Sequence, residues 1–166
     1  MGTVLNEKQR HVIPIVMVGL LMTAAYALTG ALQILVWNPM AAVPDMSREE
    51  IKTAMSAANE PLVEEPVYVW ALAGLVLAVV IGVLALVKWP DSPWMITQLF
   101  LIIIMLGMPT YFLASVNPGM SIADAFATSG GDHAPWIRIL YGTSLLSLIF
   151  FVVTLTKQDQ PPRGAT

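Results

Sequence analysis

Four long apolar segments constrain this chain more than any other feature of its sequence. They cover residues 11–37, 67–87, 94–116 and 136–156, and Arg138 is the only Asp, Glu, Lys or Arg in them. A helix needs about 20 mostly apolar residues to cross a bilayer, and it satisfies its backbone hydrogen bonds internally. A membrane β-strand would alternate apolar and polar residues, which these segments do not. The pattern therefore predicts four transmembrane helices.

The composition agrees with a membrane protein. The chain is 57% hydrophobic and 11% charged, whereas soluble domains carry about 25% charged residues. We expect a single membrane domain over residues 1–166, all-α, built as an integral membrane four-helix bundle of two tandem helical hairpins. Loops 38–66 and 117–135 connect the helices within each hairpin, and residues 158–166 are expected to form a disordered tail.

The basic residues predict how the helices are oriented. Cytoplasmic loops carry an excess of Lys and Arg. Five such residues flank the helices on the side of the termini, and three lie on the other side. We therefore expect a multi-pass protein of the cell (inner or plasma) membrane with both termini cytoplasmic and both large loops outside. The two sets are Lys8, Arg10, Lys88, Lys157 and Arg163, against Arg48, Lys52 and Arg138.

An Asn-Pro step follows the first and the third apolar segment, at Asn38-Pro39 and at Asn117-Pro118. Proline cannot continue a regular helix, and the residue before it is disfavoured in the α region. We therefore predict that each outward-going helix stops and turns at its Asn-Pro step.

The first outer loop contains the signature of a short helix. Ser47 is a good N-cap and Glu50, three residues later, completes a capping box. Ile51 and Met55 then share one face at helical spacing, and Met46 is placed to form a hydrophobic staple with Ile51. We predict a helix of about residues 48–58 that lies on the outer membrane surface or on a partner.

Small residues at four-residue spacing predict where the helices pack, because small side chains let helix backbones approach closely in lipid. The first and second helices each carry such a stripe, and we expect the two stripes to face each other inside the bundle. Contact with a partner subunit is the alternative. The stripes are Gly19, Thr23, Ala27 and Ala31 in the first helix, and Gly74, Ala78 and Gly82 in the second.

The sequence offers no catalytic, cofactor-binding or metal-ligating residues that we can single out. Ionisable residues at mid-membrane depth mark ion and proton paths, and this chain has none there. His11 and His133 are expected on opposite sides of the membrane, so they cannot hold a haem together. Asp132-His133 near Asp124 forms at best a weak metal site, and we expect it to be solvated.

The absence of cysteine excludes disulfides and Cys-ligated metals. We expect a protein that is not an enzyme and has no cofactor.

The layout resembles small four-helix membrane proteins of actinobacteria. The shared features are the basic N-terminus, the VPDMS loop at 43–47 with its short helix, and the tight turn WPDSPW at 89–94. Some proteins of this kind are accessory subunits of respiratory cytochrome supercomplexes, and others are partners of lipid transporters. The resemblance implies a non-catalytic accessory subunit of a larger membrane complex, with a respiratory supercomplex as the preferred host.

The expected partners are other integral membrane subunits and lipid, with no nucleic acid. The alternatives are a small oligomeric transporter or channel and a partner of a lipid transporter. An enzyme that acts on lipid or quinone would need a site that the sequence does not display.

Overall fold

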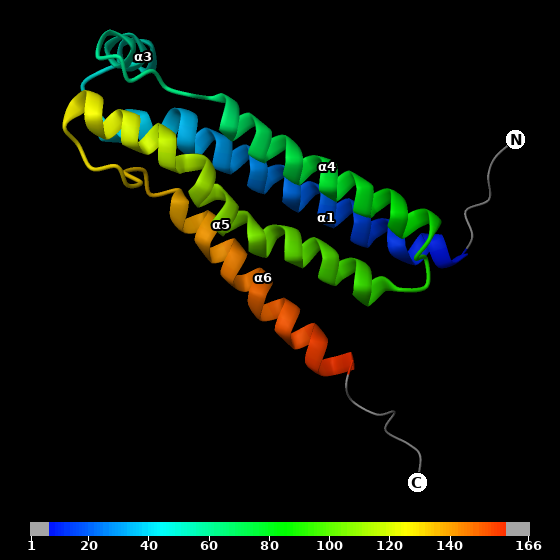
Figure 1. The fold of residues 1–166 in the computed structure, drawn as a ribbon. Helices are drawn as coiled ribbons and strands as arrows, with labels where there is room; N and C mark the ends of the chain where they lie inside the picture. Colours follow the sequence, from blue (N-terminus) through cyan, green and yellow to red (C-terminus); the bar gives the residue numbers. More distant parts are fainter. Residues whose placement is uncertain (1–6, 159–166) are drawn as a thin grey trace, which may run out of the picture.

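The computed structural model describes residues 7–158, and all the regular structure in this range is helical (Figure 1). Four helical segments are long and apolar enough to cross a membrane, which confirms the all-helical prediction of four candidate spans. The elements in chain order are α1 (Glu7–Leu32), the π-helix η1 (Gln33–Trp37), α2 (Asn38–Ala42), α3 (Arg48–Ala57), α4 (Glu65–Val87), α5 (Pro93–Phe126) and α6 (Ile137–Gln158). Residues 159–166, most of the predicted tail, lie outside the described range.

The short helix α3 lies at one end of the elongated molecule, and the start of α1 and the end of α6 lie at the other (Figure 1). We call these the α3 end and the termini end. Helices α1, α4 and α5 all contact one another, whereas α6 lies along α5 and has few contacts with α1. The described helices thus form a three-helix core with α6 attached to one side, rather than a ring in which each helix has two equal neighbours.

Two apolar clusters hold this core together. One, at the α3 end, includes Ile34, Tyr111 and Leu140. The other, nearer the termini end, includes Val12 and Phe100. The helices that contribute to them are apolar around their whole circumference, as expected for segments that face lipid on one side and protein on the other.

The prediction that both Asn-Pro steps end a helix is wrong. The helical segment that begins with α1 continues through η1 and α2 to Ala42, and α5 continues past Pro118 to Phe126. Proline weakens a helix by removing one backbone donor, but tertiary packing outweighs that loss here. Pro39 and Pro118 are both fully buried. Helix α5 ends only where Ala127 takes the left-handed conformation, with φ of 53°.

The short helix α3 has the predicted capping box but not the predicted surroundings. Ser47 caps it, and the Ser47 and Glu50 side chains each bond the other residue's backbone. Its apolar face, Ile51 and Met55, is buried against Ile122 of α5. The face is therefore covered by the chain itself, because α5 extends far enough to carry Ile122 to it. Met46 is exposed rather than stapled to Ile51.

The glycines of the two predicted stripes lie in three different environments. A Cβ at Gly82 would stand 3.0 Å from Val16 Cγ1 of α1. A Cβ at Gly19 would instead collide with the Phe100 ring of α5, and one at Gly74 would meet no atom within 4 Å. Of the remaining stripe positions, Ala78, Ala27 and Thr23 are buried and Ala31 is half-buried.

We expect Gly82→Leu to lower the thermal unfolding midpoint of the purified protein, because the new side chain would displace Val16. Overpacking of this kind costs about 1–3 kcal/mol. Gly74→Leu is the matched control on the same helix, and its midpoint should stay near that of the wild type because the space around Gly74 is open. Scanning fluorimetry in detergent measures both variants. Equal losses at the two positions would contradict the packing of α1 against α4.

Candidate functional site

Arg48 ties three segments together at the α3 end. Pro39 has no backbone N–H, so it cannot supply the hydrogen bond that the Leu35 carbonyl would receive in a regular α-helix. Arg48 Nε donates to that carbonyl over 3.2 Å instead. Arg48 Nη2 also lies 3.2 Å from Glu64 Oε1, and Lys52 Nζ lies 2.9 Å from the same oxygen. These contacts fasten α3 to the middle of η1 and to the start of α4.

Two carboxylates near α3 are stabilised in their charged form. Lys52, through a hydrogen bond, and then Tyr68, whose hydroxyl donates over 2.7 Å, hold the pKa of Glu64 below its ordinary value of 4.5. The side chain and backbone N–H of Ser47 each donate to Glu50 over 2.7 Å, and they lower the pKa of Glu50 in the same way. Both groups are therefore carboxylates at neutral pH, which keeps α3 capped and anchored.

The π-helix η1 brings two buried amides to one side of the chain. In an α-helix, residues five apart point about 140° away from each other. Here the Asn38 N–H bonds the Gln33 carbonyl, five residues back, so Asn38 lies above Gln33. Both side chains consequently reach the loop of residues 129–134. Single π turns of this kind occur often at functional sites.

The two amides hold the 129–134 loop by its backbone and by the Asp132 side chain. Asn38 Oδ1 accepts from the His133 N–H at 2.5 Å and from the Ala134 N–H at 3.4 Å. Gln33 Nε2 donates to the Ala134 carbonyl and to Asp132 Oδ1, both at 3.2 Å. Asp132 Oδ1 also accepts from the Tyr111 hydroxyl at 2.7 Å. The result is a latch between the starts of η1 and α2, the middle of α5 and the entry to α6.

This latch leaves one buried polar atom unsatisfied. Gln33 is fully buried, and its Oε1 has no hydrogen-bond partner among the described residues. An unpaired buried acceptor costs about 1–3 kcal/mol, which the two bonds from Gln33 Nε2 offset in part. Rotating the amide by 180° would place an oxygen against Asp132, so the observed orientation is the favourable one.

The structure places Asp132 and His133 in this latch rather than in a metal centre. The Asp132 carboxylate is occupied by Tyr111 and Gln33. His133 Nε2 lies 3.0 Å from the Ser129 carbonyl and 3.3 Å from Ser129 Oγ. Within residues 7–158, no group of three or more His, Cys, Asp or Glu residues is arranged to hold a metal ion. These side chains fold the loop.

Hydrogen bonds between helices lie within the candidate spans. The Ser144 hydroxyl donates to the Ile104 carbonyl at 2.8 Å, so the Tyr26 hydroxyl donates to Ser144 Oγ at 2.9 Å. This chain of bonds joins α1, α5 and α6. Gln98 Nε2 likewise donates to Thr154 Oγ1 at 3.2 Å, between α5 and α6. These side chains hold the helices of this chain to one another.

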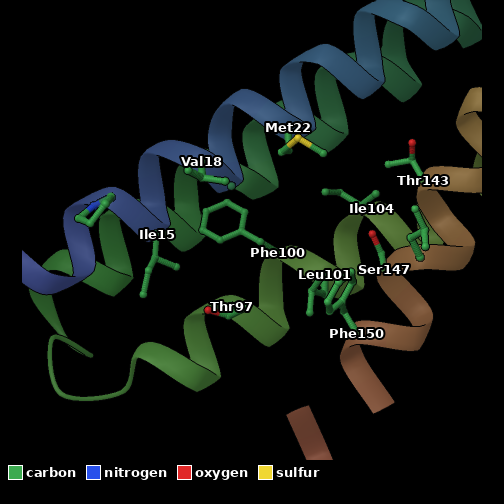
Figure 2. A pocket seen from close by; sticks show the side chains of 13 residues that line it. Ile15, Val18, Met22, Thr97, Phe100, Leu101, Ile104, Thr143, Ser147 and Phe150 are labelled. Carbon is green, nitrogen blue, oxygen red and sulfur yellow. The ribbon is translucent and has the colours of Figure 1, made fainter. Parts of the chain in front are cut away.

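An apolar groove runs between α1, α5 and α6. Its volume is about 600 Å³, and it opens on the side where α6 stands away from α1 (Figure 2). Phe100 and Leu101 of α5 lie between the two walls, and Val18 and Phe150 belong to the opposite walls. Two hydroxyl residues of α6, Thr143 and Ser147, line it as well (Figure 2).

The sequence singles out Asn38, Asp132 and His133 but does not show that these residues meet in the fold. Gln33 and Asn38 lie at the end of an apolar segment. Polar amides beside an Asn-Pro step indicate that the helix can change locally from α to π geometry. The bond from Arg48 to Leu35 carried no such signal, because it joins two segments whose relative position depends on the fold.

Comparison of the chain with protein-family models, with curated proteins and with solved structures found no match.

We expect Asn38→Ala to release the 129–134 loop. The backbone N–H groups of His133 and Ala134 would lose their acceptor, and buried amides without partners exchange faster once the segment opens. Hydrogen–deuterium exchange by mass spectrometry should show faster uptake in peptides that cover residues 129–134. Asn117→Ala is the matched control, because Asn117 also precedes a proline but is exposed and lies outside the latch. Unchanged uptake in Asn38→Ala would contradict the latch.

The Glu64 contacts predict a pH dependence. The folded-state pKa of Glu64 lies below 4.5, so its contribution to stability is present above pH 4.5 and is lost as the pH falls through the folded pKa. Wild type should therefore lose more thermal stability than Glu64→Gln when the pH is lowered from 7 to about 3.5. Unfolding midpoints of both proteins at the two pH values measure this difference, and parallel losses would refute it.

Proposed function

We propose that the protein is a non-catalytic accessory subunit of a larger membrane complex. The observation that carries this proposal is the position of α6, which packs along α5 and leaves a groove open toward α1. A membrane protein that works alone gains by enclosing its helices, because van der Waals packing drives helix association in lipid. A helix packed on one side is suited to contact with another subunit.

The polar side chains within the spans support a structural role. Several of them join helices of this chain to one another, as Tyr26, Ser144 and Gln98 do. A transporter or channel would instead direct such groups into a continuous polar path, commonly with an ionisable residue at mid-depth. The only Asp, Glu, Lys and Arg residues of the candidate spans lie at their ends, at Arg10, Glu65, Asp124 and Arg138.

The α3 end supports the same proposal. Helix α3 is anchored by Arg48 and Lys52, and the 129–134 loop is latched by Gln33 and Asn38. Ordered loops outside the spans give a partner a pre-organised surface, which lowers the entropic cost of association. In our proposal this end faces the outside of the cell membrane, both termini are cytoplasmic, and the preferred host is a respiratory cytochrome complex. The last point rests on the resemblance of the sequence.

The test is purification from native membranes. A C-terminal affinity tag on the full chain, extraction in mild detergent and mass spectrometry should yield large integral membrane subunits in a fixed ratio to the tagged protein. A visible spectrum with haem bands would support a respiratory complex as the host. If a lipid transporter copurified, that transporter would be the host instead. Recovery of the tagged protein alone, or as a homo-oligomer, would overturn the accessory function and favour a channel or transporter.

A further inference from the structure

The groove between α1, α5 and α6 contains two hydroxyl groups without partners. Ser147 is buried, with 5% of its surface exposed, and it lies near the middle of α6. Its side chain and that of Thr143 border the groove (Figure 2). Within residues 7–158 neither side chain makes a hydrogen bond. Hydroxyls in helices commonly bond a carbonyl of the preceding turn, as Thr154 does, so two free hydroxyls one turn apart are unusual.

The chemistry of these hydroxyls restricts what fills the groove. A lipid acyl chain at this depth offers no donor or acceptor, so it would leave both hydroxyls unsatisfied. A transmembrane helix offers hydroxyl, amide or backbone groups at any depth, and side chains such as Ser and Thr bond across helix interfaces in membranes. The unpaired hydroxyls therefore favour a helix over a lipid tail.

The shape and charge of the groove fit the same occupant. Thr143 and Ser147 are four residues apart, so they form a small-residue step on one face of α6 that permits close approach of a second helix. The opposite wall is α1, where Val18 and Met22 are exposed, and no charged side chain lines the groove. An occupant would thus be an apolar helix with a small or hydrogen-bonding residue near its middle.

We propose that this groove is the docking site for one transmembrane helix of a different subunit, whose small polar residue near mid-span bonds Ser147 and Thr143. This inference rests on the proposed accessory function and names the surface through which it acts. Helix α6 and helix α1 form the two walls that hold the incoming helix, and Phe100 and Leu101 lie between them.

The absence of cysteine from the chain makes the groove easy to probe. Single-cysteine variants carrying a benzophenone would be irradiated in native membranes, at Val18→Cys on the α1 wall and at Leu146→Cys on the α6 wall. Leu145→Cys is the matched control, because it is as exposed as Leu146, at 58% against 56%, but does not line the groove. Crosslinked peptides would be identified by mass spectrometry.

The expected result is that Val18 and Leu146 crosslink to the same apolar segment of the subunit that copurifies, and that Leu145 does not. Crosslinks to lipid alone, to a second copy of this chain, or to no protein would overturn the inference. Equal crosslinking of that segment from Leu145 would also overturn it, because the contact would not depend on the groove.

A second variant tests the hydroxyls themselves. Thr143→Val with Ser147→Ala removes both hydroxyls at nearly constant volume. We expect the yield of copurified subunit to fall about threefold for each of the two bonds lost, the usual strength of one such bond in a membrane. The unfolding midpoint of the isolated protein should not change, since the hydroxyls make no bond within the chain. Leu145→Ala is the control. An unchanged yield would overturn the role of the hydroxyls.

The two proposals fail in different ways. If large subunits copurify with the wild type but crosslink from other faces, the accessory function stands and the groove is not its docking site. If nothing copurifies with the wild type, the accessory function fails, and the groove inference fails with it.

Discussion

Hydrocarbon offers no hydrogen-bond partner to a polypeptide backbone, and the structure of this protein depends on that constraint. Four apolar helices satisfy it along most of their length. The constraint is hardest to meet where a proline removes a backbone donor, and Pro39 creates this situation at the end of the first span. The Leu35 carbonyl receives its hydrogen bond from Arg48, a residue in a different helix. The missing N–H of Pro39 is thus compensated by a bond between two helices, and this bond orders the α3 end.

The π turn next to Pro39 has a second consequence. It aligns Gln33 with Asn38, and these two amides bond the backbone of His133 and Ala134 and the side chain of Asp132. Tyr111 reaches the same loop from α5. The entry to α6 is therefore fixed by contacts with η1, α2 and α5, although most of α6 lies away from α1. The latch at one end and the groove farther along are parts of the same arrangement.

That arrangement gives α6 a dual character. Ser144 joins it to α5 and, through Tyr26, to α1. The adjacent Thr143 faces an open groove, as do Ser147 and Phe150 farther along the helix. A helix held firmly at one end and open on one face is a suitable surface for a partner helix. Its apolar lining selects against charged segments, and its hydroxyls select for a polar residue at a matching depth. The accessory function that we propose is built on this surface.

The sequence by itself determined the helices and where α3 is capped. Long apolar runs, the capping box of Ser47 and Glu50 and the short turn at 89–94 are local features, and local hydrogen bonding and solvation decide them. Only the tertiary structure decided that the Asn-Pro steps lie within helical segments, that Gly19 packs on α5 while Gly82 packs on α1, and that α6 stays to one side. The physical reason is that these outcomes depend on contacts between residues far apart in the chain, such as Arg48 with Leu35 or Gln33 with Asp132. Apolar helices without a marked polar face carry little information about which neighbour each face will meet, so the groove and its free hydroxyls could not be predicted from sequence periodicity.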